Sequence, residues 1–348
     1  RHQRELRDQS CACLNAAMSF TRRAAVRRAA LATFALASTG LGARAQSHPT
    51  PPWPTKPVTI VVPYTAGSAT DALTRIVAER LSPRLGQPVI VDNKAGANGS
   101  IAGGVVARAP ADGYMLMMAT AATHAGNPNL MKTVPYDSLA DFTPTGYCGS
   151  IPFTLAVRAD AGIATLADFV ARAKAAKPPL TYGAGTPSAR VISSTLAQRI
   201  GAELVHVPYK AAPLALADVL SGQIDMTFID VGTGLPQFKA GKLKALVVAS
   251  EKRSPLIPDV PTFAEAGLGP FALDAWFVVV APARTPADVA GRLGQAIAEI
   301  VAEPETAARL RAISIEPEPM APDRIPAFMK AEKEKWAMLV KAAGIDPE

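Results

Sequence analysis

Short apolar segments alternate with amphipathic segments along the chain from residue 58 onward. Residues 58–62 are all β-branched, which predicts a buried strand, and Pro63 ends it. The next segment repeats apolar residues with the spacing of one buried helical face, at Leu73, Ile76, Val77 and Leu81. Near-continuous apolar strands between helices indicate sheets that are covered on both faces. The pattern therefore predicts an α/β fold with mostly parallel sheets.

The same alternation continues to the end of the chain. Further strands are predicted at residues 88–91, 114–118, 154–157, 204–207, 226–229, 243–249 and 276–280, with amphipathic segments between them. Three predicted helix starts carry a hydroxyl residue followed three positions later by Asp, at Ser68, Thr165 and Thr285. This arrangement resembles a capping box, so each helix is expected to begin at that hydroxyl residue.

The first 45 residues have the pattern of an export signal. Residues 29–37 are apolar and follow two arginine pairs, but the run is too short to span about 30 Å of hydrocarbon. We expect the signal peptide to begin at Met18, after an upstream extension, and to be cleaved after Ala45, where small residues flank Arg44. The twin-arginine motif is incomplete, so Sec export is expected ahead of Tat export. Proline-rich residues 46–57 then form an extended leader.

The basic excess of the chain lies in this export segment. The chain has 36 Lys and Arg against 29 Asp and Glu, and residues 1–45 contain eight of the basic and two of the acidic residues. The remainder is nearly neutral at +1, so charge gives no support for nucleic-acid binding. Three cysteines are too few for a disulfide framework, and their spacing fits no zinc site. We expect neither a metal nor a cofactor.

The clearest candidate for chemistry is the segment 63–71, between the first strand and the first helix. Its small residues let a ligand approach the backbone, and free N–H groups at a helix N-terminus attract an anion. It matches neither the dinucleotide nor the phosphate-loop motif, and a capped turn without a ligand is an equal alternative. Loops at 93–100 and 182–188 have the same character. Three such loops at strand ends favour a small anionic ligand.

Residues with catalytic side chains form no convincing pair in the sequence. The nucleophile-elbow motif is missing, and a structural role is favoured for His206 and for His124. Asp225 and Asp230 flank a predicted strand without a partner that would make an acid–base couple. We therefore expect a binding protein rather than an enzyme. The alternative is an exported α/β enzyme that acts on a small anionic substrate.

Many segments of the chain, in order, resemble the Bug family of periplasmic substrate-binding proteins, which serve tripartite tricarboxylate transporters. The matching segments include residues 53–58, 64–71, 86–93, 111–114, 136–142, 205–210, 222–225, 240–243, 252–255, 258–267 and 276–282. They span roughly residues 53–345, so the resemblance covers nearly everything after the export segment.

The resemblance implies a two-lobed periplasmic-binding-protein (Venus flytrap) fold with two hinge-crossing strands, near residues 146–157 and 273–282. Lobe one would comprise residues 53–147 plus 280–348, and lobe two residues 148–275. A small carboxylate would bind in the cleft through backbone groups and ordered water, and would be delivered to membrane permease subunits or to a sensor. The protein would be periplasmic, and we expect a monomer that binds no nucleic acid.

The resemblance also places the ligand against the loops at 64–71 and 182–188. The residues expected to bind it are Tyr64, Ala66, Gly67, Ser68, Asp71, Thr123, Thr186, Ser188, Arg190 and Asp230. The chain departs from the family pattern at Thr65 and Ser68, and Arg190 stands where a histidine is common. If Arg190 faces the cleft, its guanidinium would bind a second carboxylate and favour a dicarboxylate or an aromatic acid. If it faces solvent, it would have no such role.

Overall fold

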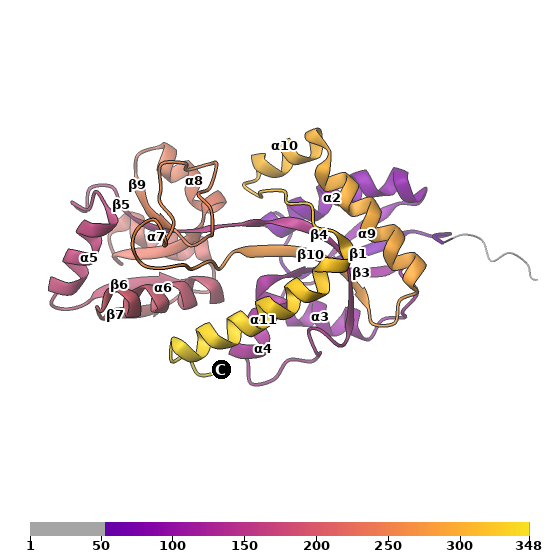
Figure 1. Cartoon of the computed structure of the whole chain (residues 1–348), viewed down its shortest axis with the longest axis horizontal. Helices are drawn as coiled ribbons and strands as arrows, with labels where there is room; N and C mark the ends of the chain where they lie inside the picture. Colours follow the sequence, from indigo (N-terminus) through magenta and orange to yellow (C-terminus); the bar gives the residue numbers. More distant parts are fainter. Residues whose placement is uncertain (1–52, 348) are drawn as a thin grey trace, which may run out of the picture. The chain divides into compact units, whose positions relative to one another are not determined.

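Two five-stranded sheets organise the chain in the computed structural model, which describes residues 53–347. The first sheet has the order β2 (Val89–Asn93), β1 (Val58–Val62), β3 (Met115–Thr120), β10 (Ala275–Pro282) and β4 (Phe142–Ile151). The second has the order β7 (Leu204–Pro208), β6 (Leu180–Ala184), β8 (Met226–Asp230), β5 (Phe153–Arg158) and β9 (Leu243–Val248). Figure 1 shows both sheets with their helices. The predicted export segment and its cleavage after Ala45 lie outside the described residues.

The predicted α/β fold is confirmed, and both sheets are mixed: four of the five strands in each point in the same direction, but the reversed strand lies between two of them, so two of the four neighbouring pairs are parallel and two are antiparallel. In the first sheet β1 is parallel to β2 and β3, while β10 is antiparallel to β3 and β4. In the second sheet β6 is parallel to β7 and β8, while β5 is antiparallel to β8 and β9. The chain changes sheet between β4 and β5, across Pro152, and again between β9 and β10. The bounds given above for the two lobes stay a prediction.

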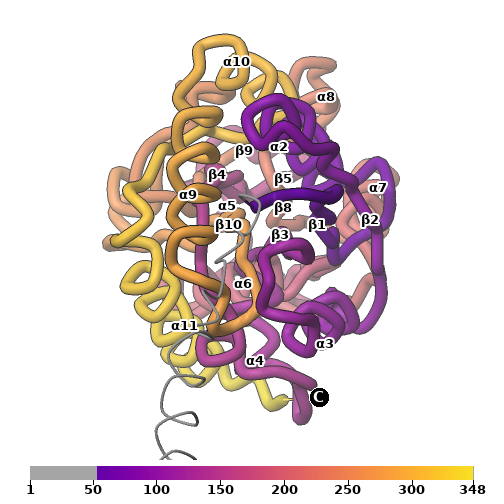
Figure 2. The backbone as a smooth tube through the Cα atoms, turned by 90° about the vertical axis from the view of Figure 1, so that its right-hand side faces the viewer, coloured from indigo at the N-terminus to yellow at the C-terminus, as the bar shows by residue number. Residues whose placement is uncertain are grey.

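Helices connect the parallel strands and follow the last strand. They are α2 (Ala69–Leu85), α3 (Ser100–Ala107), α4 (Asn127–Leu130), α5 (Leu166–Ala175), α6 (Pro187–Ile200), α7 (Ala212–Ser221), α8 (Val231–Lys239), α9 (Ala287–Ala302), α10 (Pro304–Ala312) and α11 (Ile325–Ala342), with short turns η1 (Ala97–Gly99), η2 (Ala122–Gly126) and η3 (Pro322–Arg324). Figure 2 shows α9 beside β4 and β10, with α2 across the same sheet from α11.

Strand β1 is buried on both faces, which explains its continuous apolar sequence. Ile60 belongs to a core cluster with residues of α2 and α9, such as Leu73 and Ile297. Its neighbour Val61 points to the opposite face and belongs to a second cluster, with Val106 of α3. Because successive side chains alternate between faces, helices on both sides are needed to bury the whole strand.

The apolar pattern did not predict strands β4 and β6, although the hinge-crossing strand expected near 146–157 overlaps the second half of β4. The β4 segment contains Pro144 and two glycines, and the end of β6 falls in the segment expected as a loop at 182–188. Sheet pairing decides both strands, because β6 lies between β7 and β8 and β4 pairs along the length of β10. Gly183 of β6 is also needed for packing, since a Cβ there would lie 2.5 Å from Cδ1 of Ile224.

Two of the three predicted helix caps are present in the structure. Thr165 forms a full capping box with Asp168, and the Ser68 hydroxyl accepts the backbone N–H of Asp71. The prediction for Thr285 is wrong, because its hydroxyl donates to the carbonyl of Pro282 and α9 begins at Ala287. The proline at 286 is the N-cap rather than the first helical residue.

Candidate functional site

A cavity of about 400 Å³ lies where loops of the two sheets meet. The loops that reach it follow β1, β2 and β3 in the first sheet and β6, β7 and β8 in the second, so it lies at the carboxyl ends of the parallel strands of both sheets. The lining residues are Tyr64, Ala69, Thr70, Gly96, Asn98, Gly99, Thr120, Ala121, Ala122, Ile151, Phe153, Gly185, Thr186, Pro187, Ser188, Lys210, Ala211, Ala212, Asp230, Ala275 and Phe277.

The N-terminus of α2 presents two backbone N–H groups at the cavity. The first N–H groups of a helix have no acceptor within the helix. At α2, the Ser68 hydroxyl accepts the N–H of Asp71 at 3.2 Å, which leaves the N–H groups of Ala69 and Thr70. Both of these residues line the cavity. An anion is favoured here, because the partial positive charge of the helix dipole adds to the two donors.

The second sheet contributes the same kind of donor. The Thr186 hydroxyl caps α6 by accepting the N–H of Ala189 at 3.2 Å, and Pro187 has no N–H, so the N–H of Ser188 is left at the cavity wall. Helix α7 begins beside it, and its N-cap, Ala211, has no side chain that could accept a hydrogen bond. Backbone donors from both sheets therefore meet at one cavity.

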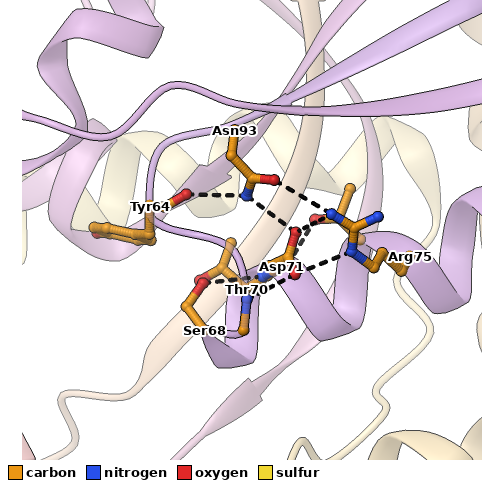
Figure 3. A network of polar contacts seen from close by, with 8 residues as sticks. Tyr64, Ser68, Thr70, Asp71, Arg75 and Asn93 are labelled. Carbon is orange, nitrogen blue, oxygen red and sulfur yellow. Dashed lines mark hydrogen bonds and ion pairs between the residues drawn. The ribbon is translucent and has the colours of Figure 1, made fainter.

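Polar side chains hold the first loop in place (Figure 3). The buried carboxylate of Asp71 accepts the N–H of Gly67 at 2.9 Å, Nδ2 of Asn93 at 3.0 Å and Nε of Arg75 at 3.0 Å. Nδ2 of Asn93 also donates to the Tyr64 carbonyl at 3.0 Å, which ties the loop to the end of β2. Burial alone would raise the pKa of Asp71, but the bonds from Arg75, Gly67 and Asn93 outweigh it and lower this pKa. Asp71 is therefore ionised and engaged within the protein.

Backbone packing holds the second loop in place. The N–H of Tyr209 donates to the carbonyl of Ala184 at 3.0 Å, just beyond the last paired residues of β6 and β7. A Cβ on Gly185 would lie 2.3 Å from the carbonyl carbon of Ala211, so only glycine allows the two loops to approach this closely. This contact sets the segment that contains Lys210 beside the N-terminus of α6.

Two charged residues line the cavity, Lys210 and Asp230. Oδ1 of Asp230 caps α8 by accepting the N–H of Thr233 at 2.8 Å, and burial raises the pKa of its carboxyl group. The Tyr64 hydroxyl lies 3.3 Å from Oγ1 of Thr120, and burial raises the pKa of this tyrosine. Much of the remaining wall is apolar and comes from alanines and from Ile151, Phe153, Ala275 and Phe277. The cavity suits a molecule with an anionic group and an apolar body.

The structure brings four of the predicted site residues together at the cavity wall: Tyr64, Thr186, Ser188 and Asp230. The other six are not among its lining residues. Ala66, Gly67 and Ser68 lie in the loop before α2, and Asp71 holds that loop from behind. Their roles toward a ligand stay predictions.

The two remaining predicted residues lie away from the cavity lining. Thr123 is fully buried, its hydroxyl donates to the carbonyl of Thr120 at 3.1 Å, and it lies 2.9 Å from Nδ1 of His124. It can therefore position Thr120, which does line the cavity. Arg190 stands in the first turn of α6, next to the lining residues Thr186 and Ser188 but not among them.

Sequence reasoning missed the contribution of the loop after β7, which supplies Lys210, Ala211 and Ala212. A signal for it was available. In a sheet whose β6 and β7 are adjacent and parallel, the loops after both strands leave the same edge. The loop at 182–188 was singled out for its glycines, whereas the lysine after β7 follows an apolar strand and resembles an ordinary surface residue.

The buried residues His124 and Cys148 do not line the cavity. His124 is buried, and desolvation together with Lys333 lowers its pKa to about 3, so it is neutral. Burial raises the pKa of the Cys148 thiol to about 12. Within residues 53–347, no cluster of three or more His, Cys, Asp or Glu could hold a metal ion. No helix in that range is long and apolar enough to span a bilayer.

Comparison with known proteins gives consistent matches. A family model described as "Tripartite tricarboxylate transporter family receptor" matches residues 73–345. The UPF0065 protein in the tcbD-tcbE intergenic region of Pseudomonas sp. (strain P51) is 35% identical over 292 residues, which are 83% of this chain and 86% of that protein. The structure of R. palustris Rpa4515 with adipate has a TM-score of 0.76 at 33% identity and covers 85% of this chain and 100% of its own. For the periplasmic binding protein BugD the TM-score is 0.72 at 30% identity, with coverages of 85% and 100%.

Proposed function

The chain belongs to the tripartite tricarboxylate transporter receptor family, and on that premise we propose that it is a periplasmic solute-binding protein for a small carboxylate. It delivers this ligand to the membrane permease subunits of such a transporter, or to a sensor. The observation that carries the proposal is the meeting of helix N-termini from both sheets at one cavity. The adipate in the related R. palustris structure supports the same class of ligand.

A carboxylate in this cavity would replace its hydration by backbone donors. Its oxygens would accept the N–H groups of Ala69 and Thr70 on one side, and that of Ser188 on the other. These donors are fixed in place before the ligand arrives, so little ordering is needed on binding. A ligand that contacts both sheets binds tightest where both sets of donors reach it, and therefore favours the conformation in which the two sheets close on it.

We assign direct ligand contacts to Tyr64, Thr186, Ser188 and Asp230, which line the cavity. The loop residues Ala66, Gly67 and Ser68 present the helix N-terminus, and Asp71 and Thr123 position the residues in front of them. The contact predicted for Arg190, in the first turn of α6, stays a prediction. We propose binding without catalysis.

Export and assembly complete the proposal. The arginine pairs, the apolar run at 29–37 and the small residues around Arg44 support a Sec signal peptide that is cleaved after Ala45. The mature protein would then be a periplasmic monomer, consistent with its membership of a receptor family.

A panel of carboxylates in a thermal-shift assay tests this function. A ligand at about 100 times its Kd should stabilise the fold by about 2.7 kcal/mol, a rise in Tm of several degrees. The panel should hold mono-, di- and tricarboxylates, and the neutral amides of the same acids serve as controls. A shift with acids and none with their amides supports the proposal. A panel in which the amides stabilise the protein as much as the acids do would contradict it.

A further inference from the structure

A chain of side-chain hydroxyl groups leads from the cavity wall to a buried histidine. The Tyr64 hydroxyl lies 3.3 Å from Oγ1 of Thr120, and both residues line the cavity. Oγ1 of Thr120 lies 3.3 Å from Oγ1 of Thr123, which in turn lies 2.9 Å from Nδ1 of His124. Thr120, Thr123 and His124 are all buried. Three hydroxyl groups thus connect the ring of His124 to the cavity.

The backbone holds the two threonines of this chain face to face. The turn η2 is π-helical and follows β3 after a single residue, so that Thr123 folds back onto Thr120. The N–H of Thr120 donates to Oγ1 of Thr123 at 2.9 Å, and the N–H of Thr123 donates to Oγ1 of Thr120 at 3.3 Å. Each hydroxyl oxygen therefore already accepts one backbone hydrogen bond. Isolated π-helical turns are rare and are frequent at functional sites.

The position of one hydrogen on His124 sets the direction of the chain. The ring is buried and neutral, so it carries a single N–H. Nε2 is buried and has no hydrogen-bond partner within residues 53–347. A buried N–H without an acceptor is rarer than a buried acceptor without a donor. The hydrogen is therefore on Nδ1, which donates to Oγ1 of Thr123.

This direction is passed on to Tyr64. Oγ1 of Thr123 accepts from His124 and from the N–H of Thr120, which occupies both of its lone pairs, and its own hydrogen bonds the Thr120 carbonyl at 3.1 Å. The Thr120 hydroxyl cannot then donate to Thr123, so it donates to the Tyr64 hydroxyl. That hydroxyl has no other hydrogen-bond partner among the described residues. Its hydrogen is left for a molecule in the cavity.

We propose that His124 is a positioning residue, which makes the Tyr64 hydroxyl a hydrogen-bond donor to the ligand. This proposal rests on the proposed function and deepens it. With the hydrogen on Nε2 the chain would reverse, because Thr123 would donate to His124, Thr120 to Thr123 and Tyr64 to Thr120. Tyr64 would then offer only lone pairs to the cavity, which repel a carboxylate. His124 therefore favours a ligand with an acceptor, such as a carboxylate oxygen, beside Tyr64.

NMR of the full chain with isotope-labelled histidine tests the direction without any ligand. The protonated and the bare ring nitrogen of a neutral imidazole resonate at different positions, so the spectrum distinguishes the two tautomers. Burial and Lys333 lower the pKa of His124 to about 3, so its signal stays that of a neutral ring at about pH 5. The same signal should persist in His206→Gln, which identifies it. We expect the hydrogen on Nδ1.

Calorimetric titration tests the consequence for binding. The probes are adipate, hexanoate and citrate, as a di-, a mono- and a tricarboxylate. The proteins are the unaltered chain, Tyr64→Phe, His124→Phe and the double variant; the phenyl ring at 124 keeps a ring against Phe142 without the N–H. Tyr182→Phe is the matched control, because that hydroxyl also lies beside a hydroxyl group, 3.2 Å from Oγ of Ser194, but does not line the cavity. Circular dichroism and Tm verify that each variant is folded.

We expect Tyr64→Phe to weaken the acid that binds tightest about tenfold, and His124→Phe to weaken it about three- to tenfold. In the Tyr64→Phe background His124→Phe should change binding less than about twofold, since His124 acts only through that hydroxyl. Tyr182→Phe should change nothing. A signal with the hydrogen on Nε2, or equal losses from His124→Phe in both backgrounds, would overturn the role of His124 and leave the proposed function in place. No binding of any acid to the unaltered protein would overturn the proposed function itself.

Discussion

The two sheets repeat one layout but hold the loops that line the cavity by different means. In each sheet an edge strand is followed by two strands parallel to it. A strand of the opposite direction comes next, and a second edge strand completes the sheet. The central loop after β1 is fixed by the charged side chains of Asp71 and Arg75 with Asn93. The equivalent loop after β6 is fixed by contact of Gly185 with the backbone of Ala211.

This difference decides where charge is available to a ligand. In the first sheet Asp71 and Lys94 are both engaged with neighbouring groups of the protein, so the wall presents neutral backbone donors. In the second sheet the loop after β6 is held by backbone contact, and Asp218 accepts the Tyr209 hydroxyl in the loop after β7, so neither contact engages Lys210 at the wall. Two loops with one geometry can therefore recognise a ligand differently, depending on whether side chains or backbone hold them.

The largest effect is expected from a methyl group at the backbone contact of the second sheet. Gly185→Ala would place a Cβ 2.3 Å from the carbonyl carbon of Ala211 and 2.4 Å from the N of Ala212, and backbone atoms cannot move aside cheaply. We expect a loss of about 2–3 kcal/mol in the free energy of unfolding and a marked loss of carboxylate binding. Chemical denaturation and calorimetry measure the two effects.

Two other glycines serve as controls for this change. Gly291→Ala in α9 meets no atom within 4 Å and should not destabilise the protein. Gly67→Ala in the first loop also has open space, but its φ of +85° costs about 1 kcal/mol. If Gly185→Ala were as mild as Gly67→Ala, backbone contact would not be what holds the second loop.

A somewhat smaller effect is expected from removing the carboxylate that holds the first loop. Asp71→Ala leaves the N–H of Gly67 and the amide of Asn93 without their acceptor, at a cost of about 2 kcal/mol at pH 7. Because the pKa of Asp71 is lowered in the folded state, its contribution is present above the unfolded value and is lost as pH falls through the folded value. Unfolding curves at pH 7 and pH 3 should show the difference between the two proteins shrink in acid. An unchanged difference would show that ionisation of Asp71 contributes nothing.

The smallest effect concerns the strand that returns the chain from the second sheet to the first. Asp274 precedes β10, and its Oδ1 is buried with no hydrogen-bond partner in the described chain. Burial raises its pKa to about 7; Lys335 opposes the rise, while Glu332, Glu251 and Glu318 add to it. Between about pH 4 and pH 7, the carboxyl group of Asp274 is therefore protonated in the folded protein and ionised in the unfolded chain. The free energy of unfolding falls as pH rises through this range.

Asp274→Asn removes the free-energy cost of ionising this carboxyl group in the folded protein. Because Asp274 is only half-buried, solvent screening should reduce the gain to about 1 kcal/mol at pH 8, with almost none at pH 4, seen as a difference in Tm. The exposed Asp323→Asn provides the control and should change neither value. A gain of equal size at both pH values would mean that the amide improves packing and that no buried charge is relieved.

The elements that the sequence predicted are those whose burial follows from one strand or helix alone. Strand β1 is recognisable because both of its faces are buried, and the cap of α5 because Thr165 and Asp168 bond each other locally. Strand β4 could not be predicted from its own apolar pattern, since its pairing with β10 joins segments far apart in the chain, and the strand expected near 146–157 came from the family resemblance. The same holds for the site. Tyr64 and Thr186 lie in loops that small residues mark in the sequence. The position of Lys210, in contrast, depends on a contact between two loops.

The most direct test of this account is a crystal structure of the protein with the dicarboxylate that stabilises it most. We predict one carboxylate of this ligand within hydrogen-bond distance of the N–H groups of Ala69 and Thr70. The N–H of Ser188 should face the same molecule. A ligand bound outside this cavity, or one inside it whose carboxylates contact none of these donors, would contradict the account.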